Sequence, residues 1–482
     1  MDFLKKIVSV LKGDSLLGHV SVLTIGTLIG HLATLAGSPI LTRIYTPEAF
    51  GTFGVIFTGI SLLAIFSTFR FELAIPLAKK EEEGFHLVIL CGWCLLFFCL
   101  ILCVAIPVIK AFHIIEGLDR ISYWMLIFFP LGCFVVGVYN TLVSWAIRAR
   151  NFWLISQTKC AQSIGIVAGQ LILGFLDCRH LGLVWGDVLG RCLGISSLLK
   201  SLWAQKYFQR FDFPDMRQLI SVAKTYKDFP MKSLPDGISD KLNSSMPIFL
   251  FSAFINNSAS GFFFFANSLL VLPSVLLGHT LSQVYLPRFV EHFQTGTLAE
   301  SVSDVLDSLT QLAVIPFCIA AVLSLNLVSL IFGESWAPAS WFIVWLAIPS
   351  CITFIFSPLS QVFTVTRRFL TALLYRTCNF FFRLGGFFLG YYWNKDYIVP
   401  AYAIMAALAG ITGISIILFI AKVKTHVIYK NLLLLLFSWG ATGLVVTYGN
   451  VYIRISYVFL LVAIFFFITI RKRGMREKRH QK

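Results

Sequence analysis

A few charged side chains stand inside long apolar stretches of this sequence, where a cation has the chemistry to bind an anion. Arg70 and Glu72 lie within STFRFELAIPLAKKEEE, and apolar residues flank both of them. Arg376 and Arg383 lie within LTALLYRTCNFFFRLGGFFLGYY, a stretch that contains no acidic residue. Charges inside apolar segments are costly and usually face a cavity, a partner or a ligand. These residues are therefore the first candidates for a binding site.

Arg70 and Glu72 are expected not to pair with each other. On a continuous helix, side chains two positions apart point about 200° apart. We expect Arg70 to meet an anion at the cytoplasmic mouth of a passage, and Glu72 to pair with a basic residue of another helix. The alternative is an arginine that reaches the headgroup level, with Glu72 closing the interface.

The other two arginines are spaced for a common path. Arg376 and Arg383 are seven positions apart, so both face the same way, roughly 10 Å apart along a helix. Two such cations predict a path for an anion; the alternative is a structural role against carboxylates or carbonyls of neighbouring helices. Asp187 and Arg191, four positions apart, predict instead an intrahelical ion pair with a structural role.

The polar stretch PDGISDKLNSSMP gathers Asp236, Asp240, Lys241 and Asn243 near the start of an apolar segment. Its first proline and glycine loosen the helix start, and Pro247 can free backbone carbonyls for an ion. We therefore expect ion coupling or gating here, with Lys241 on the path of the anion.

Two histidines, His31 and His279, could titrate in response to a proton gradient, or they could be packing residues. CGWC at 91–94 has the spacing of a redox pair without a βαβ pattern around it, and most of the eleven cysteines sit in apolar runs. GDSLLGHV at 13–20 lacks the Lys and Ser/Thr of a nucleotide-binding loop. We expect unpaired thiols, and neither a metal nor an organic cofactor.

The composition identifies an integral membrane protein. Hydrophobic residues make up 57% of the chain and charged residues 13%, against about 25% charged in soluble domains. The mean hydropathy is +0.82. A net charge of +16 could suggest nucleic acid, but the basic residues are scattered through short loops. Membrane topology explains them better, and the basic N-terminus has no cleavage site typical of a signal peptide.

Apolar runs of about 20 residues, the length that crosses a bilayer core, recur along the whole chain. With Gly, Pro and charges as boundaries, the sequence predicts fourteen membrane-spanning helices and an all-α fold. The predicted spans are residues 17–42, 48–75, 85–109, 121–146, 154–176, 181–202, 233–255, 261–285, 308–331, 340–365, 370–392, 397–421, 431–448 and 452–470.

Basic residues orient these spans. With the N-terminus on the inner side, inner segments hold 29 of the 39 lysines and arginines and outer loops hold 6. Lys159 is counted with the inner segment before the fifth span. Because positive charge is retained on the cytoplasmic side, both termini are predicted to be cytoplasmic.

The spans divide into two lobes of six with similar local sequences. TPEAFGTF and NSASGFFF each join the first and second span of a lobe, and they align Gly51 with Gly261, which indicates a repeated fold. The predicted parts are an N-terminal lobe (1–202), a cytoplasmic linker (203–232), a C-terminal lobe (233–421), and two extra helices with a basic tail (422–482).

Four segments carry a family resemblance: LTRIYTPEAFGTFGVI, FRFELAIPLAKKEEE, KDFPMKSLPDGISDKLNSSMPIFL and GFFFFANSLLVLPSVLLGHTLSQVYLPRF. In them the chain resembles the polysaccharide-exporter family of Wzx-type O-antigen flippases. This family belongs to the multidrug/oligosaccharidyl-lipid/polysaccharide exporter superfamily. The usual topology of that family, two pseudo-symmetric six-helix lobes plus two extra helices, agrees with the fourteen predicted spans.

The resemblance implies a multi-pass protein of the bacterial cytoplasmic (inner) membrane. Such a protein moves undecaprenyl-diphosphate-linked oligosaccharide, for O-antigen or a related surface polysaccharide, between leaflets by alternating access. Arg70, Lys241, Arg376 and Arg383 would then line the path of the diphosphate and sugars. A proton or Na⁺ gradient is the expected drive, and a polysaccharide polymerase and a chain-length regulator are the implied partners.

Two other functions remain open. A proton- or Na⁺-coupled multidrug exporter of the same superfamily would typically have twelve spans and less need for basic residues along a path. An enzyme acting on lipid-linked sugars would need a sizeable outer loop to form its site, and the predicted outer loops are short. We rank the flippase first, the exporter second and the enzyme third.

Overall fold

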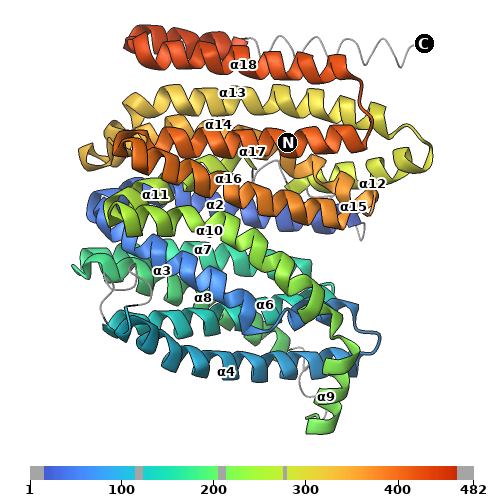
Figure 1. Ribbon diagram of the computed structural model, residues 1–482. Coiled ribbons are helices and arrows are strands. Elements are labelled where there is room, and N and C mark those ends of the chain that lie inside the picture. Colours follow the sequence, from blue (N-terminus) through green and yellow to red (C-terminus); the bar gives the residue numbers. More distant parts are fainter. Residues whose placement is uncertain (1–15, 114–122, 205–212, 275–278, 464–482) are drawn as a thin grey trace, which may run out of the picture. The chain divides into compact units, whose positions relative to one another are not determined.

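The computed structural model describes residues 16–113, 123–204, 213–274 and 279–463 (Figure 1). Within this part of the chain the regular elements are helices, and no strand occurs. The predicted all-α class is therefore confirmed. Contacts divide the chain into two compact units, residues 1–264 and 265–482, and we describe each separately.

The first unit contains the predicted N-terminal lobe and linker, and also the start of the predicted C-terminal lobe as far as residue 264. Its elements are α2 (Leu16–Ile44), α3 (Pro47–Ser67), the 3₁₀ helix η1 (Phe71–Leu77), α4 (Glu81–Ala111), the 3₁₀ helix η2 (Tyr123–Ile127), α6 (Phe128–Arg148), α7 (Phe152–Phe175), α8 (Arg179–Ala204), α9 (Met216–Thr225), the π-helical turn η4 (Phe229–Ser233) and α10 (Leu234–Phe254). Helix α11 (Asn257–Pro273) begins in this unit and ends in the second.

The second unit is also built of helices. Its elements are α12 (His279–Gln294), α13 (Leu298–Phe332), η6 (Glu334–Trp336), α14 (Ala339–Leu359), α15 (Gln361–Val365), α16 (Phe369–Trp393), η7 (Lys395–Tyr397), α17 (Ile398–Ile420), α18 (Thr425–Tyr448) and a last apolar helix (Val451–Ala463).

A helix overlaps each of the fourteen predicted spans within the described residues. Eight helices there are long and apolar enough to cross a membrane, which identifies a multi-pass membrane protein. The eight are Pro47–Ser67, Glu81–Ala111, Tyr123–Arg148, Leu181–Lys200, Leu298–Phe332, Ala339–Val365, Lys395–Ile420 and Thr425–Tyr448. The full number of crossings and the side of each terminus stay predictions, as do the lobe boundaries.

Local sequence explains where several helices start and stop. Thr46 caps α3 by accepting a hydrogen bond from the Ala49 N–H at 3.3 Å, and Pro47 occupies the first turn, where its missing N–H does no harm. Asn151 caps α7 in the same way. Helix α13 ends at Phe332, and the next residue, Gly333, has a φ of 101° in the left-handed region that favours glycine.

The aligned segments TPEAFGTF and NSASGFFF lie against each other at the starts of α3 and α11. A Cβ atom added at Gly261 would overlap the Pro47 carbonyl oxygen and lie 3.0 Å from the Gly51 nitrogen, so only glycine permits this approach. Nearby, the rings of Phe53 and Phe264 pack edge to face with centroids 5.7 Å apart. The two glycines thus lie where the starts of α3 and α11 cross, while the repeated fold that their alignment indicates stays a prediction.

In the second unit, α18 is attached to α13 by a polar clamp. Asp307 on α13 accepts hydrogen bonds from Lys430 Nζ and Asn431 Nδ2, each at 2.6 Å. Further along α13, the Arg454 guanidinium donates to Asn326 at 3.2 Å. The two helices that follow the predicted C-terminal lobe are therefore held to α13 at two levels.

Candidate functional site

The segment that carries Arg70 is a sharp corner between two helices. Helix α3 ends at Ser67, and η1 begins at Phe71. Between them Phe69 and Arg70 have φ values of 51° and 65°, a left-handed conformation that costs a residue with a side chain about 1–2 kcal/mol. The predicted continuous span to residue 75 is wrong here, because the backbone reverses its handedness before Arg70 and cannot continue the α-helix.

The corner brings Arg70 and Glu72 together. Arg70 Nη1 lies 3.7 Å from Glu72 Oε1, so the two residues form an ion pair. The expectation that they cannot pair is wrong, because it assumed a continuous helix. Glu72 is buried, with 6% exposure, and its other oxygen accepts a hydrogen bond from the Thr68 hydroxyl. A buried carboxylate needs such partners, and Glu72 finds them within its own corner rather than on another helix.

Arg70 keeps capacity for a further ligand. Its side chain is 26% exposed, and its Nε is a buried donor without a hydrogen-bond partner among the described residues. The guanidinium packs against the start of α10, where a Cβ added at Gly237 would lie 3.0 Å from Arg70 Cζ and Nε. A guanidinium with one carboxylate at 3.7 Å and donors to spare can still bind an anion.

Arg148 at the end of α6 holds the corner in place. Its Nη1 donates to the carbonyls of Ile75 (3.0 Å) and Ala78 (2.6 Å), and its Nη2 donates to that of Lys80 (2.7 Å). One side chain thereby supplies partners for three carbonyls of η1 and of the turn that follows it. The sequence identified Arg148 only as a marker of topology, since no local pattern connects it to residues 75–80.

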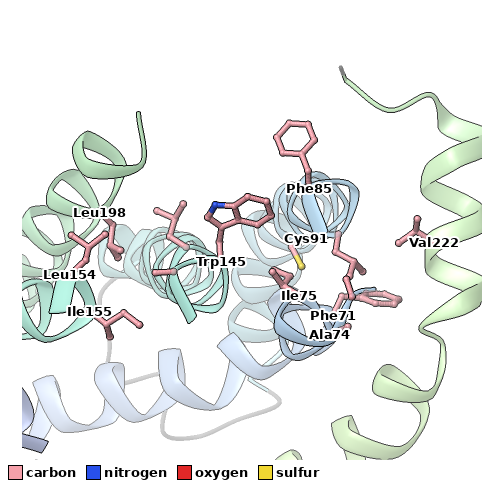
Figure 2. Packing of buried hydrophobic residues seen from close by; sticks show 14 residues of the cluster. Phe71, Ala74, Ile75, Phe85, Cys91, Trp145, Leu154, Ile155, Leu198 and Val222 are labelled. Carbon is pink, nitrogen blue, oxygen red and sulfur yellow. The ribbon is translucent and has the colours of Figure 1, made fainter. Parts of the chain in front are cut away.

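Apolar packing supports the same corner, through a cluster of buried residues that we call the η1 core. It includes Phe71, Ala74 and Ile75 of η1, Trp145 of α6 and Val222 of α9. Figure 2 shows the η1 side chains beside Phe85 and Cys91 of α4, with Trp145 on one side and Val222 on the other. Segments far apart in the sequence thus meet around Arg70.

Helix α9 is fixed to the start of α4. The Tyr226 hydroxyl, just after α9, donates to Glu83 Oε2 at 3.2 Å. Burial raises the pKa of Tyr226, and the hydrogen bond to Glu83 and its negative charge raise it further. The hydroxyl therefore stays protonated and keeps donating throughout the physiological pH range.

The predicted gating stretch approaches this corner at Gly237. Gly237 touches Arg70, whereas Asp236 and Asp240 are exposed and Lys241 is partly buried. The side-chain amide of Asn243 donates to the Ser239 carbonyl at 3.0 Å, within its own helix. A role for these four polar residues in coupling or gating stays a prediction.

Asp187 and Arg191 form the predicted intrahelical pair on α8. Arg191 Nε lies 2.7 Å from Asp187 Oδ2, and Nη2 lies 3.1 Å from Oδ1, so the pair is bidentate. The guanidinium also lies over the ring of Phe57, 5.4 Å from its centroid. Since both charges are satisfied by each other, the geometry fits the structural role that was predicted.

Lys159 is a cation that sequence reasoning misplaced. It lies in the second turn of α7 rather than in the segment before that helix. Its Nζ donates to Thr27 Oγ1 on α2 at 3.4 Å, one helical turn from His31. The chain therefore places a lysine beside the α2 face that carries His31, and its position inside the predicted span 154–176 was the signal available in the sequence.

The second unit holds the other predicted cations. Arg383 Nε donates to Asn379 Oδ1 at 2.9 Å, and its Nη1 donates to the Tyr402 hydroxyl of α17 at 3.3 Å. Asn379 lies on the same helix and Tyr402 offers a hydroxyl, so neither contact is the carboxylate or carbonyl of a neighbouring helix that the alternative named. Arg376 is partly buried on the same helix. The anion path along α16 stays a prediction. The side chain of His279 lies outside the described residues.

The described residues contain no group of three or more His, Cys, Asp or Glu side chains that could hold a metal ion. The eleven cysteines are unpaired, as expected from their apolar surroundings.

Comparisons with known proteins agree with the architecture. A family model described as "Polysaccharide biosynthesis protein" matches residues 16–293. No curated protein sequence matches the chain.

Solved structures give the fold. The chain is similar to the lipid II flippase MurJ in an inward closed conformation, with a TM-score of 0.70 and 16% identity over 94% of this chain and 99% of that one. It is also similar to an outward-facing multidrug resistance MATE transporter of the MOP superfamily (TM-score 0.57, 14% identity, 86% and 98% covered). The Vibrio cholerae MATE transporter VcmN in its bent form gives a TM-score of 0.53 at 14% identity, with 87% and 98% covered. The fold is that of these membrane transporters.

Proposed function

The chain belongs to the polysaccharide biosynthesis protein family, and on that premise we propose that it is a flippase for lipid-linked oligosaccharides. Its family and its structural neighbours are membrane flippases and transporters, not enzymes. The proposed substrate is an undecaprenyl-diphosphate-linked repeat unit of O-antigen or a related surface polysaccharide. The proposed location is the bacterial cytoplasmic membrane.

The observation that carries the proposal is the extent of the fold. The likeness to the lipid II flippase takes in a larger share of the chain than the likeness to the multidrug transporters does. The chain also continues beyond α17 into α18 and the helix Val451–Ala463, and contacts of Asp307 and Asn326 hold these two helices to α13. Two extra helices are what we expected of a polysaccharide exporter and not of a twelve-span drug exporter.

The η1 corner supplies the chemistry for such a substrate. A diphosphate carries about two negative charges, and charge-assisted contacts to arginine are the strong ones. Arg70 has exposed surface and an unused donor, and Glu72 at 3.7 Å balances the charge of the guanidinium when the site is empty. In this account the diphosphate meets Arg70 first, the sugars cross through the bundle, and the polyprenyl tail stays in lipid.

We propose that the other predicted site residues act after the diphosphate has met Arg70. Lys241, Arg376 and Arg383 would guide the diphosphate and sugars. Coupling to a proton or Na⁺ gradient would involve the polar groups that can change charge or bind an ion: Glu72, Asp236, Asp240, Asn243, His31 and His279. A polysaccharide polymerase and a chain-length regulator would act on the translocated product.

A second candidate function is a proton- or Na⁺-coupled multidrug exporter. The observation that favours it is the fold likeness to MATE transporters over 86% of the chain. A strain that lacks the gene would then show altered resistance to toxic compounds and normal surface glycan.

The test is a leaflet-transfer assay with purified protein in liposomes that contain a fluorescent undecaprenyl-diphosphate-linked oligosaccharide. Arg70→Asn removes the charge, while asparagine tolerates the left-handed backbone better than most residues. The double variant Arg70→Asn with Glu72→Gln removes both charges and retains an acceptor for Thr68. Arg70→Lys keeps the charge without the bidentate geometry.

We expect wild-type protein to equilibrate the label between leaflets. Arg70→Asn should transfer it at least about tenfold more slowly, because a charge-assisted bond is worth about 1.5–3 kcal/mol. Arg70→Lys should retain part of the wild-type rate. The double variant should be as slow as the single one. Full transfer by the double variant would mean that Arg70 only neutralises Glu72, and no transfer by wild-type protein would overturn the proposed function.

A further inference from the structure

Helix α9 presents an apolar ridge to its surroundings, which we call the α9 ridge. It consists of Phe213, just before the helix, and of Met216 and Ile220. Their exposed fractions are 81%, 66% and 49%, whereas Leu219 and Val222 on the adjoining face are buried in the first unit. The helix therefore has more apolar surface than its packing on this chain covers.

A basic stripe runs along the ridge. Positions 216, 220 and 224 follow one another at helical spacing, so exposed Lys224 continues the line of Met216 and Ile220. Exposed Arg217 flanks Met216 on the side away from the buried face. Within the described part of the chain neither Arg217 nor Lys224 has a carboxylate within 4.0 Å, whereas the later Lys232 pairs with Asp228 at 3.1 Å.

The helix also lies where a bilayer surface would be. Figure 1 shows α9 crossing the end of α4, not running alongside it. The hydrogen bond between Tyr226 and Glu83 fixes α9 at the end of α4 where that helix starts. Since α4 is long and apolar enough to cross a membrane, a helix laid across its end runs along the membrane surface.

From this placement we propose that the α9 ridge inserts at the membrane surface and that Arg217 and Lys224 bind anionic lipid headgroups. An apolar edge bordered by basic residues is the pattern of a helix that lies in the lipid interface. Each basic residue near an anionic surface strengthens binding by about fivefold. This lipid contact does not depend on the transported substrate. It would lie in the predicted linker between the two lobes, next to the η1 corner.

The test uses the full-length protein in nanodiscs, with a photoreactive benzophenone amino acid placed at Ile220 or at the neighbouring Ser221. Ser221 is exposed on the polar side of the same helix turn, so it is the matched control. One set of nanodiscs contains phosphatidylcholine alone, and the other contains phosphatidylcholine with phosphatidylglycerol as a minor component. Mass spectrometry of the cross-linked protein counts lipid adducts.

We expect at least about fivefold more lipid adduct at position 220 than at 221, and more adduct when phosphatidylglycerol is present. Arg217→Gln with Lys224→Gln should reduce the gain from phosphatidylglycerol about tenfold or more, whereas Lys422→Gln with Lys424→Gln, which removes the same charge elsewhere, should leave it unchanged. Equal adduct at 220 and 221, cross-links from 220 to the protein itself, or no effect of phosphatidylglycerol would each overturn the proposal.

Discussion

Arg148→Gln should destabilise the η1 corner by an amount that follows from the contacts of Arg148. Arg148 donates three hydrogen bonds to the carbonyls of residues 75, 78 and 80. Bonds to a charged group are worth about 1.5–3 kcal/mol, and we take the low end because Arg148 is partly exposed. A glutamine amide can restore about one of the three, so the variant should lose about 3 kcal/mol of unfolding free energy.

This loss should appear as a lower unfolding temperature. At about 2.1 cal/mol/K of unfolding entropy per residue, the first unit of residues 1–264 gains about 0.55 kcal/mol/K on unfolding. About 3 kcal/mol then lowers the midpoint by about 5 °C. The readout is a maleimide dye that fluoresces on reaction with thiols, because Cys91 and Cys133 are fully buried and become reactive only on unfolding.

The matched control is Arg150→Gln, two residues further on. Arg150 is exposed, and this change removes the same charge from the same end of α6. Its midpoint should fall by less than about 1 °C, as expected for a surface charge. Equal midpoints for the two variants would refute the claim that Arg148 holds the corner through its three carbonyl contacts.

Two further predictions concern the crossing of the helix starts and the α18 clamp. Gly51→Ala would place a Cβ 2.6 Å from the Asn257 carbonyl carbon. The same thermal assay should show that the variant loses about 1–3 kcal/mol of unfolding free energy. An unchanged unfolding midpoint would mean that the two helix starts do not approach closely at Gly51. Of the two donors to Asp307, Asn431 is buried and Lys430 is 57% exposed, so Asn431→Ala should destabilise by about 1–3 kcal/mol and Lys430→Ala by less than about 1. The reverse order would show that charge, and not burial, dominates the clamp.

Hydropathy and local spacing were enough to predict the helices and one ion pair. Runs of about 20 apolar residues mark membrane helices because the bilayer core has a fixed thickness. Asp187 and Arg191 are four positions apart on one helix, so their pairing depends on nothing outside that helix. The same rule could have identified Asn379 as a partner of Arg383.

The conformation of Arg70 could not be predicted in this way. The residues around Arg70 are as apolar as the rest of the predicted span. Neither Phe69 nor Arg70 is a residue type that favours a left-handed backbone. What holds them there is the burial of Glu72 and the reach of Arg148, which lies 68 or more positions after the carbonyls that it binds. Such tertiary contacts leave no periodic trace in the sequence.

The sequence predicts helix α9 in part. Its sequence MRQLISVAKT alternates apolar and polar positions with the period of a helix, and the Asp215 N–H donates to Gln218 Oε1 at 2.8 Å at its start. The segment is short and polar beside the membrane spans, so the sequence predicts only a linker there. Its docking on α4 through Tyr226 required the structure.

The most direct test of the central claim is deletion of the gene in the organism that carries it, followed by analysis of surface glycan and of the leaflet in which lipid-linked oligosaccharide accumulates. Wild-type and Arg70→Asn genes are reintroduced in parallel, with protein levels measured. The account predicts that the deletion and Arg70→Asn lose surface glycan and trap complete lipid-linked units on the cytoplasmic face, and that wild type restores export. Normal surface glycan in the deletion strain, with a change only in resistance to toxic compounds, would contradict it.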